Sequence, residues 1–411
     1  MMSVGIEAMN AYVTRAYIDV KELFLARNLK LERFDNLMML EKAVNVPCED
    51  AITNAVNAAK PIIDRLNEKE RNAIEMVITS SESGLDFGKS LSTYIHHYLG
   101  LSKHCRLFEI KQACYAGTAA LQMAMNYVAS EVSPGAKVLV ISADVARAAA
   151  KMTYAEPSQG TASVAMLVGD EPEIFEADFG ANGFYGYEVM DTCRPLHEIE
   201  TGDPDLSLLV YMDCLENAYQ HYASRMDNID FQTSFDYLAF HTPFAGLVKA
   251  AHRKLLRDLK KLPPQEIEAD FKKRIEPSLA YCMHVGNIYS GTVYLALAGL
   301  IATADCQSPK RVGLFSYGSG CSSEFYSGVI TAKSQQKLQE MKIKESLNSR
   351  CKLSIPEYDK ILELNMEWVF GIKDKKVELS GFAKIYEEQF LNQGLLTLKE
   401  VKNYHREYAW S

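Results

Sequence analysis

The sequence has no long hydrophobic segment and no excess of basic residues. No window holds the roughly 18 consecutive apolar residues that a membrane span needs. The first residues, MMSVGIEAMNAYV, lack the basic start and the continuous apolar stretch of a signal peptide. A net charge of −9 leaves no basic face that could neutralise phosphates. We therefore expect a protein that neither spans a membrane nor binds nucleic acid.

The nine cysteines form no recognisable framework. Their number is odd, no Cys-x-x-Cys pair occurs, and no Cys/His cluster has zinc-like spacing. We expect no metal site, a reducing cytoplasm as the location, and mostly small buried thiols, with one or two that react.

Short repeats and low-complexity tracts are also missing. A chain of 411 residues, 48% of them hydrophobic, can bury one large core or two merged ones. Apolar segments rich in branched residues alternate with segments of helical periodicity, which predicts an α/β fold with mainly buried strands. Strands are expected over 73–79, 106–110, 136–142, 163–168, 237–240 and 311–316, and helices over 51–66, 116–132, 246–262 and 288–304. Residues 177–207 show little periodicity and suggest a junction between two halves, and the charged segment from about 333 suggests a peripheral helical region.

Cys114 lies where a predicted strand turns into a helix. The strand 106–110 leads to Cys114, and a helix of small and apolar residues follows. A thiol at that place faces the positive end of the helix dipole, which predicts a lowered pKa, and nearby amides can stabilise an oxyanion. The alternative is an ordinary core cysteine on a buried helix. Spacing alone does not separate the two.

Glu82 and His241 each follow a predicted strand. Glu82 comes just after 73–79 and before Gly84, and His241 comes after 237–240 and before a proline. Chemistry in α/β proteins gathers at the carboxyl ends of buried strands. The alternatives are a loop carboxylate that caps a helix and a structural histidine.

Two further segments are candidates for ligand contact. One opens a buried helix with Gly286-Asn287-Ile-Tyr289, and the other ends a strand with Gly318-Ser319-Gly320. Glycines allow the backbone to approach a ligand closely, although either segment could be only a tight turn.

Together these segments resemble the 3-hydroxy-3-methylglutaryl-coenzyme A synthase family over most of the chain, from about residue 4 to 327. The motifs that carry the resemblance are Ala-Cys114-Tyr-Ala-Gly-Thr-Ala, Phe-His241-Thr-Pro-Phe, Gly286-Asn287-Ile-Tyr289 and Phe315-Ser-Tyr-Gly-Ser319-Gly.

The resemblance implies a thiolase fold, with two similar halves over 1–175 and 176–411 in an αβαβα layering, and a homodimer. It implies that Cys114 is the acetylated nucleophile, Glu82 the acid/base that deprotonates the acetyl methyl group, and His241 the group that polarises the acceptor carbonyl. Asn287, Tyr289, Gly318 and Ser319 would line the substrate site. The substrates would be phosphopantetheine thioesters, with no other cofactor and with ping-pong kinetics.

The segments 109–115, 187–195, 241–252 and 319–328 resemble the polyketide β-branching branch of this family. Isoprenoid relatives usually carry a lysine five residues after the histidine, where it can meet coenzyme A phosphates, and this chain has Gly246. The branch implies an acetyl-acyl carrier protein as donor and a β-ketoacyl-acyl carrier protein as acceptor. Since carrier proteins are acidic, the basic segment 252–261 could attract them. The candidate contacts are Lys249, Arg253, Lys254 and Arg257, and the alternative is a solvated helix face.

Two other functions compete with this interpretation. The first is a coenzyme A-dependent synthase that makes 3-hydroxy-3-methylglutaryl-coenzyme A from acetoacetyl-coenzyme A. The second is a non-catalytic component of an assembly line, which the short segment between Asp144 and Glu156 favours, because β-branching relatives usually carry a longer acidic insertion there. The presence of Cys114, Glu82 and His241 argues against the second.

Overall fold

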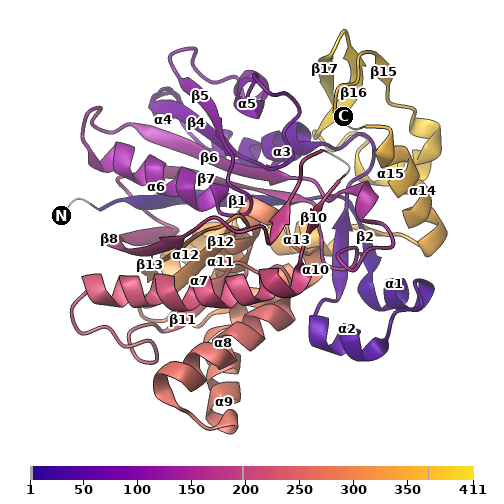
Figure 1. Ribbon diagram of the computed structural model, residues 1–411. Helices are drawn as coiled ribbons and strands as arrows, with labels where there is room; N and C mark the ends of the chain where they lie inside the picture. Colours follow the sequence, from indigo (N-terminus) through magenta and orange to yellow (C-terminus); the bar gives the residue numbers. More distant parts are fainter. Residues whose placement is uncertain (1–2, 197–198, 369) are drawn as a thin grey trace.

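A nine-stranded mixed sheet organises the computed structural model, which describes residues 3–196, 199–368 and 370–411 (Figure 1). The order across the sheet is β11 (Tyr237–Phe240), β12 (Lys310–Gly318), β13 (Ser322–Ile330), β8 (Phe175–Gly186), β1 (Gly5–Val13), β7 (Ala162–Gly169), β6 (Lys137–Asp144), β4 (Ile74–Ser80) and β5 (Arg106–Ile110). The strands β4, β5 and β6 are parallel, and so are β11 and β12. The six strands predicted from the sequence are confirmed within about two residues.

The sheet has two parts that meet at a narrow seam. The strands β1 and β8 pair only through Gly5 with Glu176 and Ile6 with Phe175. On one side of the seam all strands come from the first 170 residues, and on the other side from β8 onward. The expected boundary between 1–175 and 176–411 falls at the first residues of β8, and this division stays a prediction.

Helices cover both faces of each part (Figure 1). The helix α3 (Ala51–Ile63) packs on the outer face of β1, β7 and β6, while α7 (Pro204–Arg225) packs on β8 and β13. The helices α6 (Ala116–Ala129) and α11 (Thr292–Thr303) lie between the two parts and share one hydrophobic core. Apart from Ala302 and Thr303 at its end, the residues of α11 are buried, as its apolar sequence requires. The mixed α/β fold predicted from the sequence is confirmed.

Smaller elements complete the chain. Toward the N-terminal half they are β2 (Ala16–Asp19), α1 (Val20–Ala26), α2 (Leu31–Leu37), β3 (Glu41–Val44), α4 (Glu68–Asn72), α5 (Leu91–Tyr98), β9 (Thr192–Cys193) and β10 (Thr201–Gly202). Toward the C-terminal half they are α8 (Ala245–Lys260), α9 (Pro264–Arg274), α10 (Leu279–Val285), α12 (Ala332–Gln339), α13 (Ile343–Asn348), β14 (Cys351–Lys352), α14 (Ile355–Met366), β15 (Lys375–Lys376), α15 (Ala383–Gln389), β16 (Leu396–Lys402) and β17 (His405–Trp410). Among the described residues, no helix is both long enough and apolar enough to cross a bilayer.

The structure adds detail to two predicted segments. The segment 177–207 contains most of β8 and the start of α7, and its role as a junction between two halves stays a prediction. The segment from 333 is mainly helical as far as Gln389, but it also contains the short strands β14 and β15, and it ends in the β16–β17 hairpin. That hairpin is attached to the first half, because Arg406 Nη1 lies 3.0 Å from Asp50 Oδ2 and Tyr408 donates a hydrogen bond to the same oxygen at 2.8 Å. Asp50 is the N-cap of α3.

Candidate active site

Cys114 lies in a tight turn between β5 and α6. β5 ends at Ile110, α6 begins at Ala116, and Ala113 has a positive φ of 42°. A positive φ in a residue other than glycine marks a constrained backbone. Gly318, at the end of β12, packs against this turn, because a Cβ at Gly318 would lie 2.5 Å from the main-chain N of Tyr115. The strand–turn–helix context predicted for Cys114 is confirmed, and the structure brings Gly318 to it.

Glu82 contacts the Cys114 thiol. It follows β4, and its Oε1 accepts a hydrogen bond from Cys114 Sγ at 3.5 Å, a normal distance for a sulfur donor. Its main-chain N–H donates to Asp144 Oδ1 at 2.8 Å. Because β4 and β6 are parallel, both carboxylates lie at the same edge of the sheet. The structure therefore joins the predicted nucleophile and the predicted base.

The environment of Glu82 suits a base that works at neutral pH. Burial raises the pKa of Glu82 to about 7, with a further increase from the Asp144 carboxylate, while the Arg194 guanidinium opposes both. A carboxylate of ordinary pKa is too weak a base to take a proton from carbon. The carboxyl group is thus poised between its charged and neutral forms near pH 7.

The lowered pKa expected for Cys114 is wrong. Burial raises the pKa of the Cys114 thiol well above its usual value, and the nearby carboxylates of Glu82 and Asp144 raise it further. These effects outweigh the dipole of α6. In the resting protein the thiol keeps its proton and donates a hydrogen bond to Glu82.

His241 follows β11 and is almost completely buried. Its main-chain N–H donates to Phe315 O at 2.7 Å, which places it beside the end of β12. Burial lowers the pKa of His241 to about 3, so the imidazole is neutral at physiological pH, and its Nδ1 has no hydrogen-bond partner among the described residues. A neutral imidazole has one N–H to donate and one nitrogen that accepts.

The segment 286–292 forms the entrance to α11. The Asn287 side-chain oxygen accepts hydrogen bonds from Tyr289 N at 2.9 Å and Thr292 Oγ1 at 2.8 Å. This leaves the amide NH₂ of the partly exposed Asn287 available to a ligand. The ring of Tyr289 packs under Arg194, 5.5 Å from ring centroid to guanidinium carbon. Ser319 directly follows β12 and is partly exposed.

Sequence reasoning missed Arg194, Asp144 and Glu324. Asp144 ends β6 as Glu82 follows β4, so the same strand-end rule could have found it. Glu324 accepts a hydrogen bond from Tyr115 at 2.7 Å, next to the nucleophile, and burial raises its pKa to about 7. Arg194 comes from the segment after β9, and nothing in its local sequence marks it as a neighbour of Glu82.

The basic segment on α8 is largely paired. Lys249 contacts Glu268 of α9 at 2.8 Å, Lys254 contacts Glu216 of α7 at 2.8 Å, and Arg257 contacts its neighbour Asp258. Arg253 is exposed and forms no ion pair with any described residue. Of the four predicted carrier-protein contacts, Arg253 is therefore the one whose charge is not neutralised by an ion pair with a described residue.

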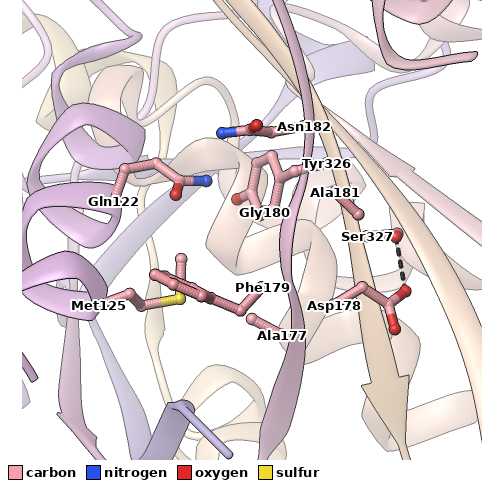
Figure 2. Close-up of a pocket in the computed structure, with 10 residues that line it drawn as sticks. All are labelled: Gln122, Met125, Ala177, Asp178, Phe179, Gly180, Ala181, Asn182, Tyr326 and Ser327. Carbon is pink, nitrogen blue, oxygen red and sulfur yellow. Dashed lines mark hydrogen bonds between the residues drawn. The ribbon is translucent and has the colours of Figure 1, made fainter. Parts of the chain in front are cut away.

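A shallow pocket lies between α6, β8 and β13 (Figure 2). Gln122 and Met125 of α6 face Phe179 and Asn182 of β8, and Ser327 donates to Asp178 at 2.6 Å. None of the predicted site residues lines this pocket, so it is separate from the thiol.

Comparison with protein families decides the family of the chain. The N-terminal family of hydroxymethylglutaryl-coenzyme A synthases matches residues 1–173, and the C-terminal family of the same synthases matches residues 256–411. The chain belongs to the hydroxymethylglutaryl-coenzyme A synthase family. The similarity extends across both the Cys114 half and the Asn287 half of the site, and the mixed α/β structure is the thiolase-like fold of this family.

Individual members of the family resemble the chain over its whole length. It is 49% identical over 419 aligned positions, covering all of both chains, to the polyketide biosynthesis 3-hydroxy-3-methylglutaryl-ACP synthase PksG of Bacillus subtilis strain 168. The crystal structure of the curacin biosynthetic pathway HMG synthase in complex with acetyl donor-ACP matches with a TM-score of 0.97 and 51% identity, again over all of both chains. The hydroxymethylglutaryl-CoA synthase of Enterococcus faecalis is 36% identical, covering 87% of this chain and 91% of that one.

Proposed function

We propose that this hydroxymethylglutaryl synthase takes an acetyl group from an acyl carrier protein onto Cys114. It then joins that group to a β-ketoacyl thioester on a second carrier protein, forming the 3-hydroxy-3-carboxymethyl branch of a polyketide. The observation that carries the proposal is full-length similarity, at about half identity, to relatives named for carrier-protein substrates and polyketide pathways.

The first half-reaction loads the thiol. Cys114 Sγ attacks the acetyl thioester, and its proton passes to the pantetheine sulfur, which leaves as a thiol. The product is an acetyl thioester on Cys114. The turn around Gly318 and Tyr115 supports this step, since it leaves Cys114 partly accessible while the thiol is surrounded by protein.

The second half-reaction forms the carbon–carbon bond. The Glu82 carboxylate removes a proton from the acetyl methyl group, and the carbanion attacks the ketone of the acceptor. His241, neutral through burial, donates a hydrogen bond from its N–H to the ketone oxygen as negative charge develops there, and the proton that Glu82 removed ends on the resulting hydroxyl group. Water then cleaves the Cys114 thioester, which leaves a carboxylate on the branch and restores the thiol.

Gly246 supports carrier proteins over coenzyme A as substrates. A Cβ at Gly246 would lie 1.7 Å from the main-chain oxygen of Asn36, so the end of α2 closes against the start of α8. Even alanine does not fit there without a shift of the backbone, and a lysine aimed at nucleotide phosphates fits still less. Phosphopantetheine on a carrier protein lacks those phosphates and needs no such contact.

Surface charge supports acyl carrier proteins as the partners. α8 begins four residues after His241, and on its outer surface Arg253 presents a cation without an ion-pair partner in the part of the chain that the structure describes. An acidic carrier protein would be attracted to it. The proposed chemistry needs no cofactor other than the substrates' own phosphopantetheine, and the cytoplasmic location stays a prediction from the sequence.

We also propose a homodimer that forms along β5. This strand lies at one edge of the nine-stranded sheet and, among the described strands, pairs with β4 alone. Ile110 O faces β4, where it accepts from Ser81 N, so by alternation the backbone groups of Leu107 and Glu109 face outward. Unpaired edges are usually covered, and a twofold axis would pair two β5 strands antiparallel.

Intact-mass spectrometry tests the function. The protein is mixed separately with acetyl-acyl carrier protein and with acetyl-coenzyme A, and the gain of one acetyl group is followed with time. We expect acetylation of the wild type, none of Cys114→Ala, and faster loading from the carrier protein. Faster loading from coenzyme A would favour the acetoacetyl-coenzyme A reaction instead.

A further inference from the structure

Arg194 contacts Glu82 at two points. Its Nη1 donates a hydrogen bond to the main-chain oxygen of Glu82 at 3.0 Å, and its Nη2 lies 3.4 Å from Oε2 of the side chain. The other carboxylate oxygen, Oε1, faces Cys114. Each oxygen of the carboxylate therefore has its own partner, a cation on one side and the thiol on the other.

Arg194 is itself fixed by two further charges. Glu200 lies 3.4 Å from the same Nη2, and Arg147 binds Glu200 at 2.9 Å. The result is a chain of alternating charge, Arg147–Glu200–Arg194–Glu82, whose side chains are all less than one-fifth exposed. Its members come from the segment after β6, the β9–β10 region and the end of β4, so the chain connects parts of the protein that are distant in sequence.

We propose that Arg194 is a positioning residue that keeps the Glu82 carboxylate charged and directed at the acyl group on Cys114. The proposal rests on the proposed role of Glu82 as the base. Arg194 contacts Glu82 and Glu200 rather than Cys114, so it acts through Glu82.

The surroundings of Glu82 explain why one cation matters. Asp144 of β6 and Glu200 are acidic, while the Cys114 thiol and the Tyr289 phenol are neutral at physiological pH. Among the described residues, Arg194 is the only cation in contact with Glu82, and Arg147 reaches it only through Glu200. Without Arg194, burial and two neighbouring carboxylates would favour the protonated form of Glu82, which cannot accept the methyl proton.

The proposal predicts a specific change in pH dependence. Arg194→Gln should still accept an acetyl group from acetyl-carrier protein, because the thiol is untouched. In deuterated buffer without acceptor, the exchange of the acetyl methyl hydrogens at pH 7 should fall at least about fivefold, since a rise of one unit in the pKa of Glu82 from about 7 lowers its charged fraction from one half to about one eleventh. Exchange should recover as the pH rises, and Arg194→Lys should retain most of it at pH 7.

The control is Arg311→Gln. Arg311 lies on β12 and forms an ion pair with Asp178 at 3.0 Å, and its replacement should leave the exchange unchanged. Circular dichroism first checks that Arg194→Gln is folded. If the folded variant keeps the wild-type midpoint in the pH dependence of exchange, the proposal is overturned. This holds whether its exchange rate is unchanged or is lower at every pH. A failure of Arg194→Lys to restore exchange in a folded protein would also overturn it. If the acetylated wild type shows no exchange, or exchange that Glu82→Gln does not reduce, then the proposed role of Glu82 fails instead.

Discussion

The side chain of Asp144 holds the backbone of Glu82, with Oδ1 accepting the Glu82 N–H at 2.8 Å. The same carboxylate accepts hydrogen bonds from Ser83 at 3.0 Å and from Ser290 at 2.7 Å. The loop after β4 is thus attached to β6 and to the start of α11 through groups other than the Glu82 side chain. That side chain can be changed chemically while its Cα stays in place.

Glu82→Gln is expected to separate the two half-reactions. The amide is isosteric but cannot remove a proton from carbon, so condensation should fall by about 10²–10⁴, the usual contribution of a general base. Acetylation of Cys114 should continue, within about tenfold of the wild type. Single-turnover product formation and intact mass measure the two steps. Glu340→Gln, at an exposed carboxylate after α12, is the control, and loss of both steps would contradict the division of roles.

The condensation step should depend on pH through Glu82. The base is active only when it is deprotonated, and its pKa is raised to about 7. The single-turnover rate on pre-acetylated enzyme should therefore rise with pH up to about 7 and level off above it. His241, with a pKa of about 3, stays neutral over this range and adds no further inflection. A flat profile between pH 5.5 and 8.5 would contradict this assignment.

Gly246→Ala should destabilise the protein. The new methyl group would overlap the Asn36 main-chain oxygen, and overpacking of this kind costs about 1–3 kcal/mol of unfolding free energy. Chemical denaturation measures the change. Gly88→Ala is the matched control, because the nearest atom to its Cβ, the Asp86 carboxylate, would lie 3.7 Å away. Equal stability of the two variants would show that α2 can move away from α8.

Leu107→Pro should convert the proposed dimer into a monomer. Proline removes an N–H on the outward edge of β5, whereas Leu107→Ala removes the same side chain and keeps the N–H. Light scattering after gel filtration should show half the mass for the proline variant only. A monomeric wild type, or a dimeric folded proline variant, would exclude pairing through β5.

Arg253→Glu should slow loading from acetyl-carrier protein by about tenfold, since it reverses an uncommitted surface charge. Loading from acetyl-coenzyme A, which does not involve the carrier protein's surface, should be unaffected. Lys399→Glu, on the exposed side of β16, is the matched control. Equal rates for both variants at low salt would remove α8 as the docking surface.

The sequence predicted best those parts of the site that local pattern determines. A strand, a turn and a helix of small residues placed Cys114, and the same reasoning placed Glu82 and His241 just beyond strand ends. The strand β8 was missed because Gly180, Asn182 and Gly183 interrupt the usual apolar alternation. Its stability comes from pairing with β13, a contact far away in the sequence.

Charge relationships could not be predicted in the same way. The pKa of Cys114 depends on burial and on carboxylates from β4 and β6, which outweigh the nearby helix end. Arg194 reaches Glu82 across more than a hundred residues of sequence, from a segment without periodicity. Local sequence specifies which groups are present at each strand end, whereas the electrostatic environment of these groups depends on the assembled fold.

The attachment of the β16–β17 hairpin to the N-cap of α3 has a consequence for biosynthesis. β17 follows α3 by more than 300 residues, so the outer layer of the first half stays incomplete until the ribosome has translated the residues between them. Until then Asp50 lacks the arginine that neutralises it and the tyrosine that donates a hydrogen bond to it. The nascent chain cannot close that layer before β17 has been made.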